Sequence, residues 1–379
     1  MSTPLIEAVE VFRVRASIRS IWLFVAVTLD SGHVGLGEAT LDGRMDGVER
    51  QLRGIADRSL GTRAREIRLA EDDHLVAAAA KSAFNQALCD GLARVSATPA
   101  AQFFGGERRQ EVGLYANINR RTALRTPEGF ADSAQLAFDA GFRAFKIAPF
   151  DEVTAGAPLS PQDFAMGLRR IEAVRALIGS DARLMVDCHW RFDMNGAASL
   201  MDACSALGIH WVECPLPERA DTLADIAKLR NSAARRGLLL AGGEDIVGLG
   251  SLQPYLDHDC YDVIMPDIKY VGGPLEMLRV AEALEKAGVE FSPHNPSGPV
   301  SHAASAEVCA AANQVGLLEC QFAETPLFTT LVRGGCPLAA RIALNEKRVG
   351  FGVTFRRSVL ARHLLTQSKV MEDAYDKDN

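Results

Sequence analysis

The sequence has no uninterrupted apolar run that approaches the length needed to cross a membrane. Its first residues, MSTPLIE, provide neither the basic start nor the apolar stretch of a secretory signal, so we expect a cytoplasmic protein without a membrane partner. The 41 Lys and Arg residues are outnumbered by 48 Asp and Glu residues, and the formal net charge is −7. Basic blocks with interleaved aromatic residues are also missing, which argues against nucleic acid as a partner.

The eight cysteines include no Cys-x-x-Cys pair, the usual mark of a structural zinc site. In a chain of 379 residues without a signal sequence, they are expected to be reduced and mostly buried. The sequence also lacks a glycine-rich phosphate loop, which argues against an open doubly wound sheet. Its length suffices for one large barrel and a smaller domain.

The first 112 residues predict a small α+β domain, because strand-like runs are followed by alanine-rich sequence with apolar residues at helical spacing. The predicted strands are residues 4–14, 21–29 and 33–38, and the predicted helices are residues 44–53 and 72–95. A tight turn at Asp30-Ser31-Gly32 should join the second and third strands into an antiparallel sheet. Helix-breaking sequence around residues 96–107 places a domain boundary near residue 112.

Residues 113–335 have a different sequence pattern, in which short apolar runs alternate with helical segments. The apolar runs are residues 112–116, 143–147, 183–187, 209–213, 238–241, 262–266, 289–293 and 316–320, and helices are predicted at 127–140, 161–178, 220–236 and 274–287. Eight strands alternating with helices predict a closed parallel α/β barrel. Residues 336–379 add no further βα unit, and we expect them to pack back on the first domain.

Three of the runs lead into an acidic residue, namely Asp187, Glu213 and Glu244. Glu213 follows Asp187 by 26 residues and Glu244 follows Glu213 by 31, which is the length of one βα unit. Because the C-terminal ends of parallel strands share one rim of a barrel, the three carboxylates can converge. Oxygen ligands of high charge suit a hard divalent ion, Mg²⁺ first and Mn²⁺ as a substitute, whereas zinc favours His and Cys. Three unrelated acids that cap nearby helices are the alternative.

Further polar residues follow the other runs. They are Asn119, Lys146, His189, Asp267, His294 and Glu319. Asp267 ends the sixth run and His294 follows the seventh, one strand away. A carboxylate bonded to one imidazole nitrogen fixes the tautomer and raises the basicity of the other nitrogen, so this pair suits a general base. A purely structural hydrogen bond at the rim is the alternative.

With these residues the chain resembles the enolase superfamily, and within it the mandelate racemase subgroup. The three strand-end acids, the pairing of His294 with Asp267, and a Gly pair that begins five residues after Asp267 carry the resemblance. It implies a modified TIM-type (β/α)7β barrel with an N-terminal α+β capping domain. It also implies one Mg²⁺ per active site and an ene-diolate formed when the proton α to a carboxylate is removed. Members are commonly dimers or octamers, so we expect a homo-oligomer.

The second strand departs from the racemases of this subgroup, which carry Lys-x-Lys there with the second Lys as a base. Here the sequence is Phe145-Lys146-Ile147-Ala148, so that base is missing. The third strand instead continues to His189 and Arg191, a pattern similar to galactonate dehydratase and other acid-sugar dehydratases. A dehydratase needs a base for the C2 proton and an acid for the departing C3 hydroxyl. The resemblance assigns these roles to His294 and His189.

We therefore expect a hydro-lyase that converts a small carboxylate, a sugar acid of the aldonate or aldarate type, to a 2-keto-3-deoxy acid. By the same resemblance, Lys146 would neutralise the substrate carboxylate and Glu319 would hydrogen-bond to it. Asn119, Arg191 and Lys269 are further candidates for substrate binding, although a supporting or solvated role is favoured for Lys269. Specificity should come from the cap loops at residues 16–20 and 39–47.

Two other functions stay open at this point. One is a racemase or epimerase of the same superfamily, in which Lys146 or Lys269 is the second base. The other is a barrel that has lost catalysis and only binds, although the full set of acids and the His294–Asp267 pair argue against it. The sequence does not indicate which sugar acid would be used.

Overall fold

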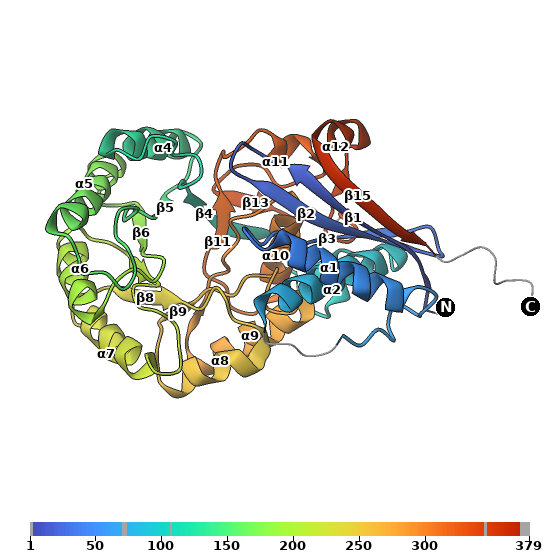
Figure 1. Cartoon of the computed structure of the whole chain (residues 1–379), viewed down its shortest axis with the longest axis horizontal. Helices are drawn as coiled ribbons and strands as arrows, with labels where there is room; N and C mark the ends of the chain where they lie inside the picture. The colour runs from blue at the N-terminus through green and yellow to red at the C-terminus, as the bar shows by residue number, and fades with distance from the viewer. Residues whose placement is uncertain (1–2, 70–73, 107, 345–346, 372–379) are drawn as a thin grey trace, which may run out of the picture.

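The computed structural model describes residues 3–69, 74–106, 108–344 and 347–371. It has two parts that lie side by side, a ring of strands and helices and a smaller antiparallel sheet with its own helices (Figure 1). The ring comes from the middle of the sequence, and the first and last described residues lie in the smaller part. This arrangement agrees with the α/β barrel and α+β cap expected from the sequence.

The cap sheet has the strand order β15-β1-β2-β3, with antiparallel neighbours. Its strands are β1 (Ile6–Arg15), β2 (Ile21–Leu29), β3 (Val34–Glu38) and β15 (Leu364–Met371). The last strand pairs with the first, from Ala8 opposite Met371 to Val14 opposite Leu364. The C-terminal strand therefore completes a sheet that the N-terminal strands begin.

The cap helices are α1 (Met45–Ser59), α2 (Leu75–Val95) and the short α3 (Ala100–Phe103). α1 extends six residues beyond the predicted end because Ile55 and Ala56 continue its buried face. Residues 72 and 73, the predicted start of α2, lie outside the described residues. α2 packs closely on β3, where a Cβ atom at Gly35 or Gly37 would lie 1.9 or 2.0 Å from a carbonyl oxygen of α2. Glycine at these two positions therefore permits the contact between helix and strand.

The barrel strands are short and parallel, and each pairs with its neighbour in chain order. They are β4 (Glu111–Asn117), β5 (Ala144–Ile147), β6 (Arg183–Asp187), β7 (Trp211–Glu213), β8 (Leu239–Gly242), β9 (Val263–Ile264), β10 (Glu290–Phe291) and β11 (Leu318–Gln321). β11 pairs with β4, and backbone N–H groups of Gly316 and Glu319 donate to the carbonyls of Phe291 and Pro293. These bonds join β11 to β10, so the strands close into a ring.

One α-helix separates each pair of successive barrel strands. These helices are α4 (Pro127–Asp139), α5 (Pro161–Ile178), α6 (Met194–Ala206), α7 (Leu223–Ala234), α8 (Gly248–Asp257), α9 (Pro274–Ala287) and α10 (Pro299–Ala311). Several begin where the sequence predicts, because Thr126 and Ser160 cap α4 and α5 and proline occupies the first helical position. Eight strands with seven intervening helices in the described residues match the expected (β/α)7β barrel.

The elements after β11 return the chain to the cap. They are α11 (Leu327–Thr330), β12 (Val332–Arg333), β13 (Arg341–Ala343), β14 (Thr354–Phe355) and α12 (Arg357–His363). β13 pairs antiparallel with β4, and β12 pairs with β14. The described residues after position 335 therefore contact the barrel through β13 before β15 joins the cap sheet.

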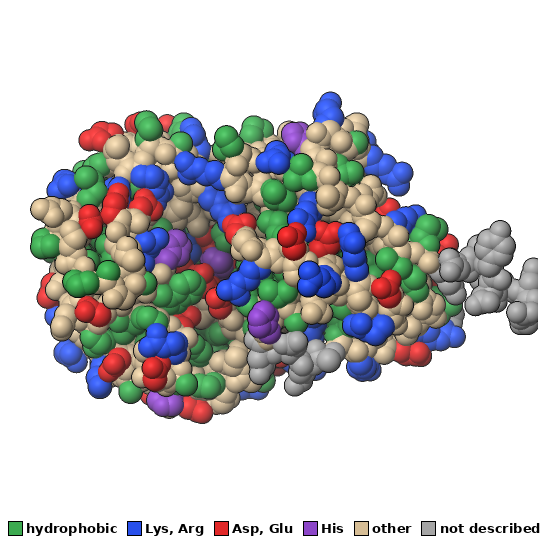
Figure 2. Space-filling model, viewed as in Figure 1, with side chains coloured by type: hydrophobic (Ala, Val, Ile, Leu, Met, Phe, Trp, Pro, Cys, Tyr) green, Lys and Arg blue, Asp and Glu red, His purple; other side chains and the backbone are tan. Residues whose placement is uncertain are grey.

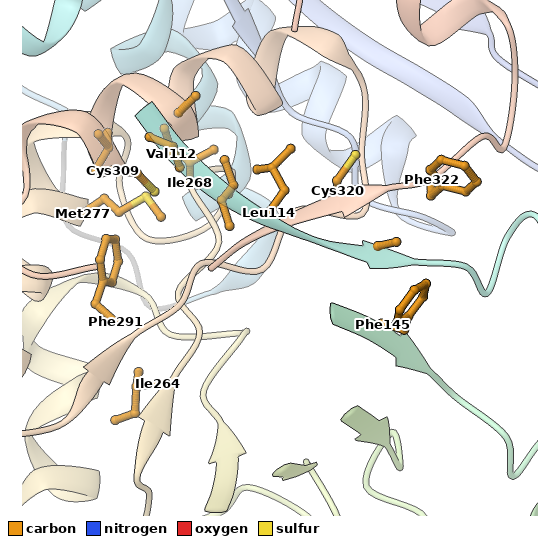
Figure 3. Close-up of a cluster of buried hydrophobic side chains, with 14 of the residues drawn as sticks. Val112, Leu114, Phe145, Ile264, Ile268, Met277, Phe291, Cys309, Cys320 and Phe322 are labelled. Carbon is orange, nitrogen blue, oxygen red and sulfur yellow. The ribbon is translucent and has the colours of Figure 1, made fainter. Parts of the chain in front are cut away.

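The barrel has apolar layers on both sides of its strands. Inside the ring, Tyr115, Met185, Trp211 and Met265 fill the floor below the strand ends. Outside it, side chains such as Leu114 and Phe291 pack against Met277 and Cys309 of the surrounding helices (Figure 3). All eight cysteines are free and buried, as the sequence predicts. Over the described residues, no helix is both long and apolar enough to cross a membrane.

Candidate active site

The three strand-end acids lie together at one rim of the barrel. Asp187 is opposite Glu213 in the pairing of β6 with β7, and Glu213 is opposite Ala241 in the pairing of β7 with β8. Glu244 follows three residues after Ala241. The exposed fractions of the acids are 3% for Asp187, 0% for Glu213 and 9% for Glu244. Histidine and acidic side chains gather in a hollow over this half of the molecule (Figure 2).

Lys146 on β5 points into this group from inside the ring. Its Nζ lies 2.6 Å from Oε1 of Glu213 and 3.4 Å from Oε1 of Glu319, and all three side chains are fully buried. Trp211, two residues before Glu213 on the same strand face, donates from Nε1 to Oε2 of Glu213 at 3.2 Å. Burial raises the pKa of Glu213 to about 8, and the nearby Lys146 only partly opposes this.

His189 follows β6 and folds back on its end. Its Nε2 lies 2.8 Å from Oδ2 of Asp187, and its backbone N–H donates to Oδ1 at 2.9 Å. His189 and Trp190 have φ of +47° and +57°, a left-handed backbone that ordinary residues adopt at a cost. This turn directs the imidazole toward the acids. The charge of Asp187 raises the pKa of His189 to about 9, although burial acts in the opposite direction.

His294 and Asp267 form the expected pair. Nδ1 of His294 lies 2.9 Å from Oδ2 of Asp267, which leaves Nε2 facing the acids, 3.6 Å from Glu244 and 3.8 Å from Glu319. Burial lowers the pKa of His294, but the surrounding carboxylates outweigh it and raise the pKa to about 9. Lys269 is fully buried and bonds Asp267 through both Nζ and its backbone N–H. Its ammonium is therefore held by the carboxylate that orients His294, and it is not solvated.

The other predicted residues divide between the centre and the edge of the site. Glu319 on β11 is buried at the centre, where it accepts hydrogen bonds from the side chain of Asn117 and from the backbone N–H of Asn295. Asn119 lies at the edge, where its Oδ1 accepts the N–H of Ala148 at 2.6 Å. Arg191 also lies at the edge, because its guanidinium donates to the backbone carbonyls of the loop after β5, at 2.6 and 3.1 Å.

The acids suit a divalent cation in chemistry and charge. In the arrangement of the described residues, no group of three or more His, Cys, Asp or Glu side chains could hold a metal ion. In this arrangement Lys146 and His189 form ion pairs with oxygens of Glu213 and Asp187. The donor set nevertheless consists of oxygen atoms alone, as Mg²⁺ requires. The carboxylates at this site outnumber its two buried lysines, and the imidazoles of His189 and His294 share the remaining charge. The carboxylates are Asp187, Glu213, Glu244, Asp267 and Glu319.

Comparison with known proteins agrees with this geometry. Residues 129–359 match the family described as enolase C-terminal domain-like, and residues 12–105 match the mandelate racemase/muconate lactonizing enzyme N-terminal domain. The two matches together cover most of the cap and the barrel. The chain belongs to the mandelate racemase/muconate lactonizing enzyme family.

Relatives and solved structures of this family cover most of the chain. A D-gluconate dehydratase of Thermoproteus tenax is 27% identical, over 92% of this chain and 71% of its own. A D-galactonate dehydratase of Ralstonia nicotianae is 26% identical, over 75% of this chain and 74% of its own. A mandelate racemase/muconate lactonizing enzyme-like protein from Rubrobacter xylanophilus has the same fold, with a TM-score of 0.86 and 24% identity over 98% of this chain and 100% of its own.

The structure also brings residues to this site that the sequence analysis did not single out. Trp211 has a signal in the sequence, because its spacing of two from Glu213 puts both side chains on one face of the strand. Asn295 has none, since only the fold brings its backbone to Glu319. Arg120, after β4, donates to Ser20 at 3.1 Å and to Asp42 at 2.8 Å. It thereby ties both cap loops to the barrel mouth in this family member.

Proposed function

We propose that this protein is a hydro-lyase that uses Mg²⁺ to dehydrate a sugar acid, an aldonate or aldarate, to a 2-keto-3-deoxy acid. The names of the curated relatives, which are dehydratases of gluconate, xylonate and galactonate at about 26% identity, support the reaction class. The observation that carries the proposal is the placement of His189 and His294. They follow β6 and β10, which are four strands apart in a ring of eight, and so face the acids from opposite sides.

The opposed histidines suit the two proton transfers of a dehydration. Asp267 bonds Nδ1 of His294, which leaves Nε2 to remove the proton α to the carboxylate. His189, on the other side, would protonate the departing C3 hydroxyl. Each transfer is of the kind that contributes about 10²- to 10⁴-fold in rate. Proton removal and hydroxyl departure from opposite faces yield an enol, which converts to the 2-keto-3-deoxy product.

Asp187, Glu213 and Glu244 would hold the metal ion. A bound Mg²⁺ would stabilise the negative charge that develops on the substrate carboxylate as the α proton leaves. Lys146 and Glu319, which lie next to the metal acids, would bind the oxygens of that carboxylate. Both side chains have an exposed fraction of zero, so they lie shielded from water, where charges act more strongly.

Epimerisation is the less favoured reaction. It needs a second base on the face opposite His294, and the two lysines considered for that role are Lys146 and Lys269. Both ammonium groups are buried and paired with carboxylates. Lys269 moreover shares Asp267 with His294, so it lies on the same side of the site as the first base.

The test is a screen of aldonic and aldaric acids with Mg²⁺, in which semicarbazide detects the 2-keto-3-deoxy product. A productive acid should lose turnover in the Glu213→Gln variant. His189→Asn should lower dehydration by at least about 100-fold while exchange of the C2 proton with D₂O continues. His210→Asn, at the opposite end of β7, is the matched control and should keep full activity. Deuterium at C2 in both epimers without keto product would replace this proposal with epimerisation.

A further inference from the structure

A buried carboxylate of the cap domain forms hydrogen bonds with the barrel segment that follows His294. Glu38, at the end of β3, has an exposed fraction of zero. Its Oε1 accepts the N–H of Gly298 at 2.7 Å, and its Oε2 accepts the N–H of Ser301 at 3.0 Å. A Cβ atom at Gly298 would lie 2.9 Å from both oxygens, so the glycine permits this approach. Glu38 therefore holds the first turn of α10, where a carboxylate also complements the helix dipole.

A short chain of hydrogen bonds connects this turn to the residue next to His294. The hydroxyl of Ser301 donates to Oδ1 of Asn295 at 2.9 Å. The backbone N–H of Asn295 donates to Oε2 of Glu319 at 2.9 Å. Asn295 is thus fixed between α10 and the active-site carboxylate, and its peptide bond to His294 restricts where the imidazole can lie.

The same part of the cap also holds the loop that carries Asp267. Gln86 on α2 accepts the N–H of Glu38 at 3.2 Å and donates to the carbonyl of Glu38 at 3.1 Å. Its Nε2 also lies 3.3 Å from the carbonyl of Ile268, the residue after Asp267. Five residues after Asp267, Ser82 accepts the N–H of Gly272 and Asn85 donates to its carbonyl, both at 2.8 Å.

We propose that Glu38 and Gln86 are positioning residues for the base, and that the cap sets the geometry of the His294–Asp267 pair. This inference rests on the proposed function. The two loops come from different strands, β9 and β10, and Glu38 with Gln86 forms one hydrogen-bonded unit that contacts both. A general base works only within hydrogen-bond reach of the proton that it removes, so a shift of about 1 Å in one loop can cost about 100-fold in rate.

The test compares Glu38→Gln with Glu307→Gln. A glutamine at position 38 offers one acceptor oxygen to two backbone N–H groups and directs its own NH₂ at the other. Glu307 is a matched control because it is also fully buried, lies on the same helix α10, and also accepts a backbone N–H from the cap region, that of Ala101 at 3.1 Å. It lies two turns beyond the segment that Glu38 holds.

Hydrogen exchange of the 294–301 segment, measured by mass spectrometry, tests the positioning without any substrate. Glu38→Gln should speed exchange there by at least about 10-fold, and Glu307→Gln should leave it within about 2-fold. With a productive sugar acid, Glu38→Gln should lower kcat by about 10- to 100-fold while KM changes by less than about 3-fold. Glu307→Gln should keep kcat within about 2-fold, even if its melting temperature falls as far as that of Glu38→Gln.

A second, milder variant keeps the inference testable if Glu38→Gln does not fold. Ser301→Ala removes only the hydroxyl that bonds Asn295, and it should give the same selective loss of kcat. The inference is overturned if Glu38→Gln and Ser301→Ala keep wild-type kcat and exchange, or if Glu307→Gln loses as much kcat. Failure of the proposed function would look different, because His294→Asn would then retain turnover, or no sugar acid would react, while the exchange result still stands.

Discussion

We expect the buried imidazole of His302 to lower the stability of this protein in acid. His302 lies on α10 with 1% of its surface exposed, and its Nδ1 is 2.8 Å from the side-chain nitrogen of Asn295. Since an amide nitrogen donates, Nδ1 is assigned as the acceptor and the ring is neutral. Burial lowers its pKa from 6.5 to about 4. Protonation would therefore place an unpaired charge in the core and break the bond to Asn295.

The sign and size of the effect follow from linkage. Between pH 6.5 and 4 the unfolded chain binds a proton at His302 that the folded chain does not, so stability rises with pH through this window and is lost as the pH falls. At pH 5 the unfolded imidazole is almost fully protonated, whereas the folded one remains mostly neutral. The loss from this single residue between pH 7 and pH 5 is about 2 kcal/mol.

Urea unfolding of the wild type and of His302→Gln at pH 7 and pH 5 measures the contribution of His302 to the free energy of unfolding. Gln keeps an acceptor for Asn295 but does not titrate, so the variant should lose about 2 kcal/mol less than the wild type between the two pH values. Other titrating groups contribute equally to both proteins and cancel in the comparison. His258→Gln, at an exposed histidine, should behave as the wild type does. Equal losses in the wild type and His302→Gln would refute the reasoning.

Two further predictions concern the site and its entrance. Lys146→Met removes the buried ammonium that pairs with Glu213 and Glu319 and leaves the Glu319 carboxylate without its cation, so the free energy of unfolding should fall by about 3–5 kcal/mol. Unchanged stability in urea would contradict the ion pairs as described. Arg120→Ala releases Ser20 and the other cap loop from the barrel mouth, so KM should rise by about 3- to 10-fold with kcat nearly constant. Arg219→Ala, which removes an exposed ion pair elsewhere, should leave KM unchanged, and an equal rise in both variants would disprove the role of Arg120.

The barrel could be predicted from the sequence because its signals are local. Apolar runs such as residues 183–187 mark the strands, and Pro161 after Ser160 marks a helix start where α5 indeed begins. Strand lengths were predicted less well. β9 and β10 contain only two residues each, because the ladder needs a hydrogen-bonding neighbour that the sequence pattern does not show.

The candidate site could be predicted in part for the same reason. The acids and His294 follow strands that are spaced by one βα unit, so their common position at one rim of the barrel follows from the parallel topology alone. The position of the Lys269 side chain could not be predicted, because a Lys two residues after Asp267 can face solvent or turn inward. It is buried because the loop returns its ammonium to Asp267, and the backbone path that does so does not follow from the residue types.

The sequence by itself determined the order of strands and helices, the caps that begin the helices, and the rim at which the acids gather. These features depend on hydrophobic periodicity and on neighbours close in the chain. Only the tertiary structure decided that Lys146 pairs with Glu213, that His189 folds back on Asp187, and that Glu38 reaches the loop of His294. Such contacts join residues as far apart as 263 positions, as in the bond between Glu38 and Ser301. Their partners are backbone groups and charged side chains, which occur throughout the chain. Only the tertiary packing decides which of them come into contact.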